Sequence, residues 1–287
     1  VVITCALVGG GVADRMKFSA FLIFSAFWLF LVYVPTVHWV WGGGFLQKLG
    51  VLDFAGGTVV HINAGVAGLV AALVLGPRLG FGRDNLAPYD LSMAVVGTGL
   101  LWVGWFGFNG GSALAAGSRA AYAVTATHLA ACAGAVVWMG IEWAQRDKPS
   151  VLGIISGAVA GLGTVTPASG FILPWHGIVI GGLAGAVCYW ACIRLKHALR
   201  YDDSLDVFGV HGVGGILGTL MAGVFATGAV SASADAPAGL NGLLYGNPGQ
   251  LLTQAVGVGV TVAWCALGTF AALLAPVLFT ALRACRV

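Results

Sequence analysis

Residues 53–65, DFAGGTVVHINAG, place a carboxylate eight residues before a histidine, in a run of small and apolar residues that continues to Leu75. An apolar run of about 20 residues crosses a bilayer core as a helix, because a helix satisfies its backbone hydrogen bonds internally. At ~1.5 Å per residue, His61 lies about 12 Å into this helix, near the middle of the membrane. Ionisable side chains at that depth are costly and usually face a cavity or a partner.

The composition excludes an ordinary soluble protein. Of 287 residues, 59% are apolar and only 8% are charged, against about 25% charged residues in soluble domains. The 46 glycines fall inside apolar runs, where small residues let membrane helices pack closely. The net charge of +3 is too small and too scattered to indicate nucleic acid binding. The six cysteines lack the spacing of a disulfide framework or zinc site, so we predict no metal and no cofactor.

The hydropathy pattern predicts an all-α polytopic membrane protein, with one transmembrane domain over residues 1–287. Short polar links rich in Gly and Pro separate eight complete spans, and the end of a further helix precedes them. The predicted spans are 18–36, 54–75, 90–112, 120–143, 150–167, 172–193, 206–227 and 249–282.

The cations predict the orientation of these spans. If the links alternate sides, one side receives eleven of the thirteen Lys and Arg residues and the other receives only Lys48 and Arg119. The positive-inside rule makes the first side cytoplasmic, which also places the C-terminus there. The eleven are Arg15, Lys17, Arg78, Arg83, Arg146, Lys148, Arg194, Lys196, Arg200, Arg283 and Arg286.

The stretch at Asp53 recurs as DSLDVFGVHGVGGILGT from Asp203, on a span that runs in the opposite direction. Inverted repeats of this kind place the substrate path of transporters near the membrane midplane, between the two halves. A single mid-membrane histidine is more often a satisfied structural residue, but two at matching depths favour function. The matched residues are Asp53, His61, Gly65 and Gly68 in the first copy and Asp203, His211, Gly215 and Gly218 in the second.

We expect His61 and His211 to meet across the pseudo-two-fold axis, with one ring nitrogen hydrogen-bonded to the other. This bond would impose complementary tautomers and leave the outer nitrogens facing a path. An alternative of another class is an electron-transfer protein in which both histidines ligate haem iron. His128 is expected to pack within its span or at a subunit contact, and His38, His176 and His197 to lie at the membrane interface.

Asp53 precedes a helix, so we expect it to cap the helix N-terminus, and its charge would also favour an arriving cation. In HWVWGGGF, Trp41 lies in the preceding link, where the ordinary interpretation is an interfacial aromatic belt. In LLWVGWFGFNGGSA, Trp105, Phe108 and Ser112 follow one another along a span that ends on the same outer side, and Phe108 and Ser112, four residues apart, share a helix face. Aromatic faces and a hydroxyl together suit a small cation that donates hydrogen bonds.

Five stretches in order closely resemble the ammonium transporters of the Amt/Mep/Rh superfamily, on the bacterial Amt side. They are VWGGG, DFAGGTVVHINAG, GWFGFNGGSA, KPSVLGIISGAVAGLGTVTPASG and DDSLDVFGVHGVGGILG, and the resemblance covers essentially the whole chain. It implies an Amt-type bundle of inverted repeats with eleven helices. Two helices and a second gate phenylalanine are therefore expected before Val1, and a cytoplasmic tail after Val287.

The resemblance also implies a function and residue roles. The chain would be a transporter and not an enzyme, moving ammonium or ammonia, with methylammonium as a further candidate, in a homotrimer of a bacterial inner membrane. The cytoplasmic PII signalling protein is a candidate partner, and an ammonium sensor of the same fold coupled to a signalling domain is the alternative. The implied roles are proton relay for His61 and His211, ammonium recruitment for Trp41, Ser112 and Asp53, and gate or pore aromatics for Phe108 and Trp105.

Overall fold

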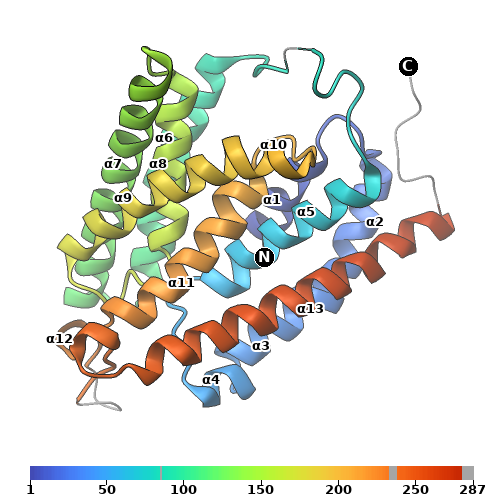
Figure 1. Ribbon diagram of the computed structural model, residues 1–287. Coiled ribbons are helices and arrows are strands. Elements are labelled where there is room, and N and C mark those ends of the chain that lie inside the picture. Colours follow the sequence, from blue (N-terminus) through green and yellow to red (C-terminus); the bar gives the residue numbers. More distant parts are fainter. Residues whose placement is uncertain (85, 233–237, 280–287) are drawn as a thin grey trace.

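The computed structural model describes residues 1–84, 86–232 and 238–279, and every regular element in these ranges is a helix (Figure 1). The all-α prediction is therefore confirmed. Four segments are π-helical, η1 to η4, and η5 is a 3-10 turn. The elements are α1 Val2–Val12, α2 Phe18–Trp28, η1 Leu29–Tyr33, α3 Val34–Trp41, α4 Phe45–Leu49, η2 Gly57–Ile62, α5 Asn63–Leu75, α6 Leu91–Gly111, α7 Ser118–Arg146, α8 Val151–Val165, α9 Pro174–Trp190, η3 Ala191–Leu195, α10 Lys196–Leu199, η4 Phe208–Gly212, α11 Val213–Phe225, α12 Gly228–Ser231, η5 Leu243–Tyr245 and α13 Gly249–Phe279.

Seven helical stretches in the described ranges are long and apolar enough to cross a membrane, so the predicted count of eight is not confirmed. The difference is α8, predicted as 150–167, which has only 15 residues. It ends at Val165, and Pro167 follows two residues later, where its ring lacks the N–H that would continue the helix hydrogen bonds. The first predicted span is longer than expected, since α3 continues past Pro35 and includes Trp41. The end of the span predicted at 249–282, with Arg283 and Arg286, lies outside the described residues.

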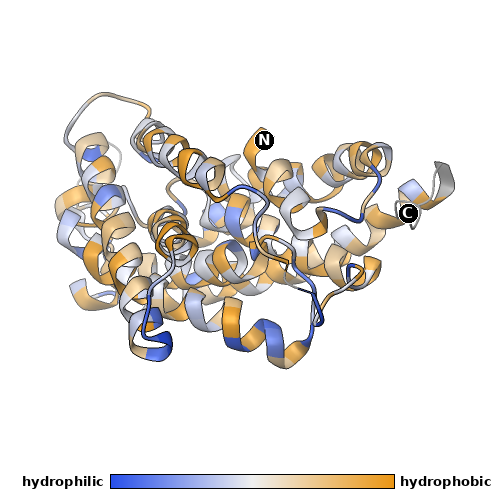
Figure 2. Cartoon of the chain, turned by 90° about the horizontal axis from the view of Figure 1, so that it is seen from above, coloured by the Kyte–Doolittle hydropathy of each residue, from blue (hydrophilic) through white to orange (hydrophobic). Residues whose placement is uncertain are grey.

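The helices form two groups joined by α11. Helices α7, α8 and α9 pack together with α6 beside them, whereas α5 packs between α1 and the long α13 (Figure 1). Helix α11 contacts both groups, through α8 and α9 on one side and α13 on the other. Viewed from above, apolar residues dominate the helices and hydrophilic ones gather in the connecting segments (Figure 2). We call the end of the bundle at Trp41 outer and the end at Arg78 inner, after the predicted orientation.

The π-helical segments occur in the same order in both repeats. The first copy runs α2–η1–α3 and then η2–α5; the second runs α9–η3–α10 and then η4–α11. Each histidine lies in the π-helical turn that begins its span, η2 for His61 and η4 for His211. Such turns are rare and frequent at functional sites. Arg78, three residues after the end of α5, binds Asp202 just before η4, so the two histidine helices run antiparallel.

Candidate functional site

The two histidine helices cross at glycines. A Cβ at Gly65 would lie 2.2 Å from the Gly212 Cα, and a Cβ at Gly215 would lie 2.9 Å from the His61 Cβ. Carbon atoms normally approach only to about 3.5–4.0 Å, so any side chain at these two positions would push the helices apart. Gly65 and Gly215, which mark the sequence repeat, thus allow the close approach of α5 to η4 and of α11 to η2.

This crossing brings the two imidazoles together, as predicted. The Nδ1 atoms of His61 and His211 are 3.1 Å apart, and the rings lie nearly parallel, 9° apart with centroids separated by 5.2 Å. His61 is fully buried and His211 is 6% exposed. The Nδ1 atoms are hydrogen-bonded directly to each other, so the two rings meet edge to edge and leave no space for a haem between them.

A hydrogen bond between two Nδ1 atoms requires one to carry the proton and the other to accept it, so the neutral pair holds complementary tautomers. One remaining Nε2 is then an acceptor and the other a donor. The Nε2 of His61 is buried and has no hydrogen-bond partner among the described residues. A buried polar atom of this kind is costly to leave unpaired, and it marks the point where the pair can exchange a proton or a ligand.

An aromatic column continues from the histidine pair towards the outer end. The Trp105 indole stacks on His61 at 5.5 Å and 6°, and Phe108 lies edge-on to Trp105 at 5.9 Å. Trp105 donates from Nε1 to the Thr166 hydroxyl at 2.9 Å, and Thr166 donates to the Leu162 carbonyl at 2.8 Å. Sequence reasoning missed Thr166, although it lies in the quoted stretch VTPASG that ends α8.

Asp53 caps the first histidine helix, as predicted. Its side chain accepts hydrogen bonds from the backbone amides of Gly56, Gly57, Thr58 and Val59, at 2.7, 2.6, 2.8 and 3.3 Å. The Thr58 hydroxyl is a fifth donor to the same carboxylate. These bonds satisfy the orphan amides of the helix N-terminus. The carboxylate is only 6% exposed, so it faces the helix start and not bulk water.

The predicted outer residues fall into two hydrogen-bonded pairs. Trp41 is the last residue of α3 and not part of a link, and its indole donates to the Asp53 carbonyl at 2.8 Å. Ser112 follows α6 and donates to the Phe108 carbonyl at 2.8 Å. Trp41 is 40% exposed, so part of the indole is accessible. Within the described ranges no hydrogen bond joins one pair to the other.

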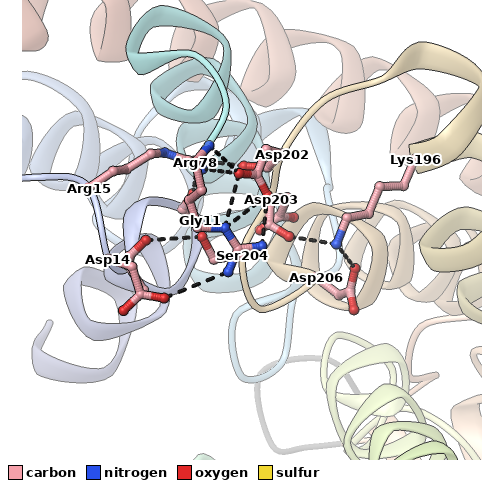
Figure 3. A network of polar contacts seen from close by, with 10 residues as sticks. Gly11, Asp14, Arg15, Arg78, Lys196, Asp202, Asp203, Ser204 and Asp206 are labelled. Carbon is pink, nitrogen blue, oxygen red and sulfur yellow. Dashed lines mark hydrogen bonds and ion pairs between the residues drawn. The ribbon is translucent and has the colours of Figure 1, made fainter. Parts of the chain in front are cut away.

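The inner end repeats the cap with a charged support (Figure 3). Asp203 accepts from the Phe208 amide at 2.7 Å, at the start of η4. Its neighbour Asp202 is buried and pairs with Arg15 at 2.8 Å and with Arg78 at 2.8 Å. Burial alone would raise the pKa of the Asp202 carboxyl, but the hydrogen bonds and charge of Arg78, with the charge of Arg15, lower it below its ordinary value. The sequence predicted Asp203 as the counterpart of Asp53, but it used Arg15 and Arg78 only to predict the orientation and did not predict their contacts with Asp202.

Comparison with known proteins decides the family. The sequence model of the Ammonium Transporter Family matches residues 1–286. The chain belongs to the ammonium transporter family. It is 47% identical over 285 residues to the ammonium transporter of Bacillus subtilis (strain 168), covering 99% of this chain and 68% of that protein. Across the first three curated relatives the chain spans 62–68% of their length.

Solved structures of the family share the fold. The crystal structure of Candida albicans Mep2 superposes with a TM-score of 0.90 at 36% identity, over 98% of this chain and 63% of that one. A structure described as a sensor Amt protein superposes with a TM-score of 0.87 at 30% identity, over 98% of this chain and 70% of that one. Both confirm the Amt-type bundle for this family member.

The remaining histidines of this ammonium transporter family member lie away from the crossing. His128 is exposed on α7, with Trp102 at 5.5 Å and Phe106 at 5.8 Å from its ring. His38 and His197 are exposed, in keeping with the interfacial prediction. His176 differs: it is 1% exposed and bonded to the Leu173 amide and Tyr245 hydroxyl, because it closes the first turn of α9.

We expect Asp203 to make stability depend on pH. Burial raises the pKa of this carboxyl to about 6, and Asp206 adds to the effect, whereas the Phe208 amide and Lys196 oppose it. A carboxyl with a raised folded-state pKa stabilises the fold when protonated, so the melting temperature should fall as pH rises from about 4 to about 6. Thermal unfolding in detergent across this window should show the fall in the wild type, and Asp203→Asn should remove it. A wild-type melting temperature that rises relative to Asp203→Asn across the same window would contradict this assignment.

Proposed function

We propose that the complete protein is an ammonium transporter whose pore passes the His61–His211 pair. The observation that carries this proposal is the buried histidine pair with Trp105 stacked above it. Two hydrogen-bonded imidazoles, sealed from bulk water at mid-membrane and reached past aromatic rings, suit a small substrate that can lose and regain a proton. Membership of the ammonium transporter family supports the same substrate.

Recruitment is assigned to Trp41, Ser112 and Asp53 at the outer end. The exposed part of the Trp41 indole can attract ammonium by a cation–π interaction. The Ser112 hydroxyl donates its hydrogen to the Phe108 carbonyl, so its oxygen lone pairs can accept a hydrogen bond from the substrate. The negative charge of the Asp53 side chain attracts the cation. Its backbone carbonyl accepts a hydrogen bond from the Trp41 indole and so holds that ring in place. Phe108, between this site and Trp105, is the gate residue that the chain supplies.

The histidine pair solves an energetic problem. Moving a bare monovalent cation into a low-dielectric medium costs on the order of 20 kcal/mol by Born reasoning, so an apolar pore requires another route. Transfer of the proton to the pair lets neutral ammonia cross the apolar segment while the proton passes between the ring nitrogens. Potassium carries no transferable proton, so the same device excludes it.

The recruitment assignment predicts a change in affinity. Trp41→Leu, or Ser112→Ala, in the complete protein should raise the half-saturating ammonium concentration about fivefold, which corresponds to the ~1 kcal/mol of a cation–π contact or hydrogen bond. Transport currents in proteoliposomes at graded ammonium concentrations measure this. Trp175→Leu is the matched control, because Trp175 is 53% exposed at the start of α9 and should leave the curve unchanged. Wild-type protein without saturable ammonium transport would defeat the proposal itself.

Assembly and setting complete the proposal. We propose a homotrimer in a bacterial inner membrane, with the C-terminus in the cytoplasm and PII protein as a candidate partner there. The exposed position of His128 at mid-depth of α7, between two aromatic rings, supports a protein neighbour on this face. Likeness to the sensor Amt protein supports an ammonium sensor as second candidate. A signalling domain after Val287 in the complete gene would favour the sensor, and sequencing that gene tests it.

A further inference from the structure

Gln254 is a fully buried amide in α13, and all its hydrogen-bonding capacity is used. Its Oε1 accepts from the Leu52 amide at 2.7 Å and from the Gln250 side chain at 3.2 Å. Its Nε2 donates to the Leu52 carbonyl at 2.7 Å and to the Thr219 carbonyl at 2.9 Å. An amide has two acceptor and two donor positions, so none is left over. The side chain is 0% exposed.

These bonds hold the residue that precedes Asp53. The Gln254 side chain binds both the backbone N–H and the backbone C=O of Leu52. Asp53 follows directly, and its carbonyl holds the Trp41 indole. The position of Trp41 is therefore linked through two backbone residues to α13. The bond to Thr219 ties the same segment to α11, the helix of His211.

At both ends of the protein, a side chain from a distant helix or loop binds the backbone carbonyl of the residue before the capping aspartate, but the side chain differs. At the inner end the carbonyl of Asp202, which precedes the capping Asp203, accepts from the Arg15 guanidinium. At the outer end the equivalent carbonyl is that of Leu52, bound by Gln254. A neutral amide supports the outer segment without adding a positive charge beside a site for cations, whereas a guanidinium there would repel them.

A glycine of α11, Gly223, packs against the Gln254 side chain. A Cβ at Gly223 of α11 would lie 2.8 Å from the Gln254 Cγ, so only glycine fits opposite. An apolar residue would suit a buried site in a membrane helix better than an amide unless the hydrogen bonds are needed. We propose that Gln254 is a positioning residue for ammonium recruitment, which sets the place of Asp53 and Trp41. This inference rests on the proposed transport function.

Gln254→Met tests it in the complete transporter, because methionine matches glutamine in length and removes all four hydrogen bonds. We expect the half-saturating ammonium concentration to rise about tenfold, with the maximal current per inserted protein retained within about twofold. Thr261→Val is the matched control: Thr261 is also 0% exposed on α13, but its hydroxyl bonds only to Gly257 of its own helix. It should leave both quantities unchanged. If Gln254→Met does not reach the membrane, Gln254→Asn is measured with the same expectation, because it stays neutral but is one methylene too short to bind both backbone groups of Leu52.

Two outcomes would overturn the inference. One is an unchanged half-saturating concentration in Gln254→Met or Gln254→Asn while the wild type transports ammonium. The other is a loss of maximal current that follows the loss of thermal stability, as a purely structural residue would give. A wild type without saturable transport would instead contradict the proposed function, so the two failures are distinguishable.

Discussion

Replacing His61 or His211 with alanine is expected to lower ammonium-selective transport by at least about 100-fold, the usual contribution of a positioned proton-transfer group. Each variant leaves a single imidazole, so the Nδ1–Nδ1 hydrogen bond of 3.1 Å disappears and no proton can pass between the rings. Both side chains are buried, and alanine leaves an enlarged pocket beneath Trp105. Residual flux through that pocket should therefore lose its selectivity against potassium.

The measurement is current in proteoliposomes with ammonium or potassium as the only permeant cation. His128→Ala is the control, because His128 is exposed on α7 and contacts Trp102 and Phe106 instead of the pair. It should keep both rate and selectivity. Undiminished, potassium-excluding ammonium currents in His61→Ala would remove the pair from the proton path.

The second large effect is expected for Gly65→Ala. The added methyl would lie 2.2 Å from the Gly212 Cα, and backbone atoms cannot rotate away as a side chain can. Normal carbon contacts require a separation of about 3.5–4.0 Å, so α5 and η4 must move apart by more than about 1 Å. That displacement exceeds the tolerance of the hydrogen bond between His61 and His211. We expect transport to be lost, with a destabilisation of about 1–3 kcal/mol from overpacking.

Transport and thermal unfolding should be measured together for this variant. Gly259→Ala on α13 is the control, because a Cβ there meets nothing within 4 Å, and it should behave as the wild type. The important comparison is between function and stability: folded Gly65→Ala protein in the membrane should still be inactive. Normal transport in that protein would mean that the helices do not need this close contact.

Much of the site follows from one sequence because its parts are local or repeated. The spacing from Asp53 to His61 predicts a capped helix with a mid-membrane histidine, and its second copy at Asp203 predicts the antiparallel partner. Hydropathy predicts the spans, although α8 is shorter than its predicted span of 150–167. The first span was predicted to end at residue 36, with Trp41 in the link after it, but the helix continues through η1 and α3 to Trp41.

The supports of the site could not be predicted in the same way. Gln254 and Leu52 are 202 residues apart, and Arg15 and Asp202 are 187 apart. A polar residue in or beside an apolar run gives no sign of its distant partner: Gln254 was not singled out, and Arg15 entered only as one of the cations that predict the orientation. The hydrogen bond from Trp105 to Thr166 could not be predicted for a related reason, since it depends on how the end of α8 lies beside α6.

In the hydrogen bond between the Nδ1 atoms of His61 and His211, one ring is the donor and the other the acceptor, so the pair has a direction. A proton accepted at one end and released at the other reverses the donor and acceptor, so the pair then points the opposite way. A second proton in the same direction must wait until both rings have exchanged their protons again. Turnover would therefore be limited by this resetting step, and the packing of Trp105 against His61, which restricts rotation of that ring, would determine how fast the pair recovers.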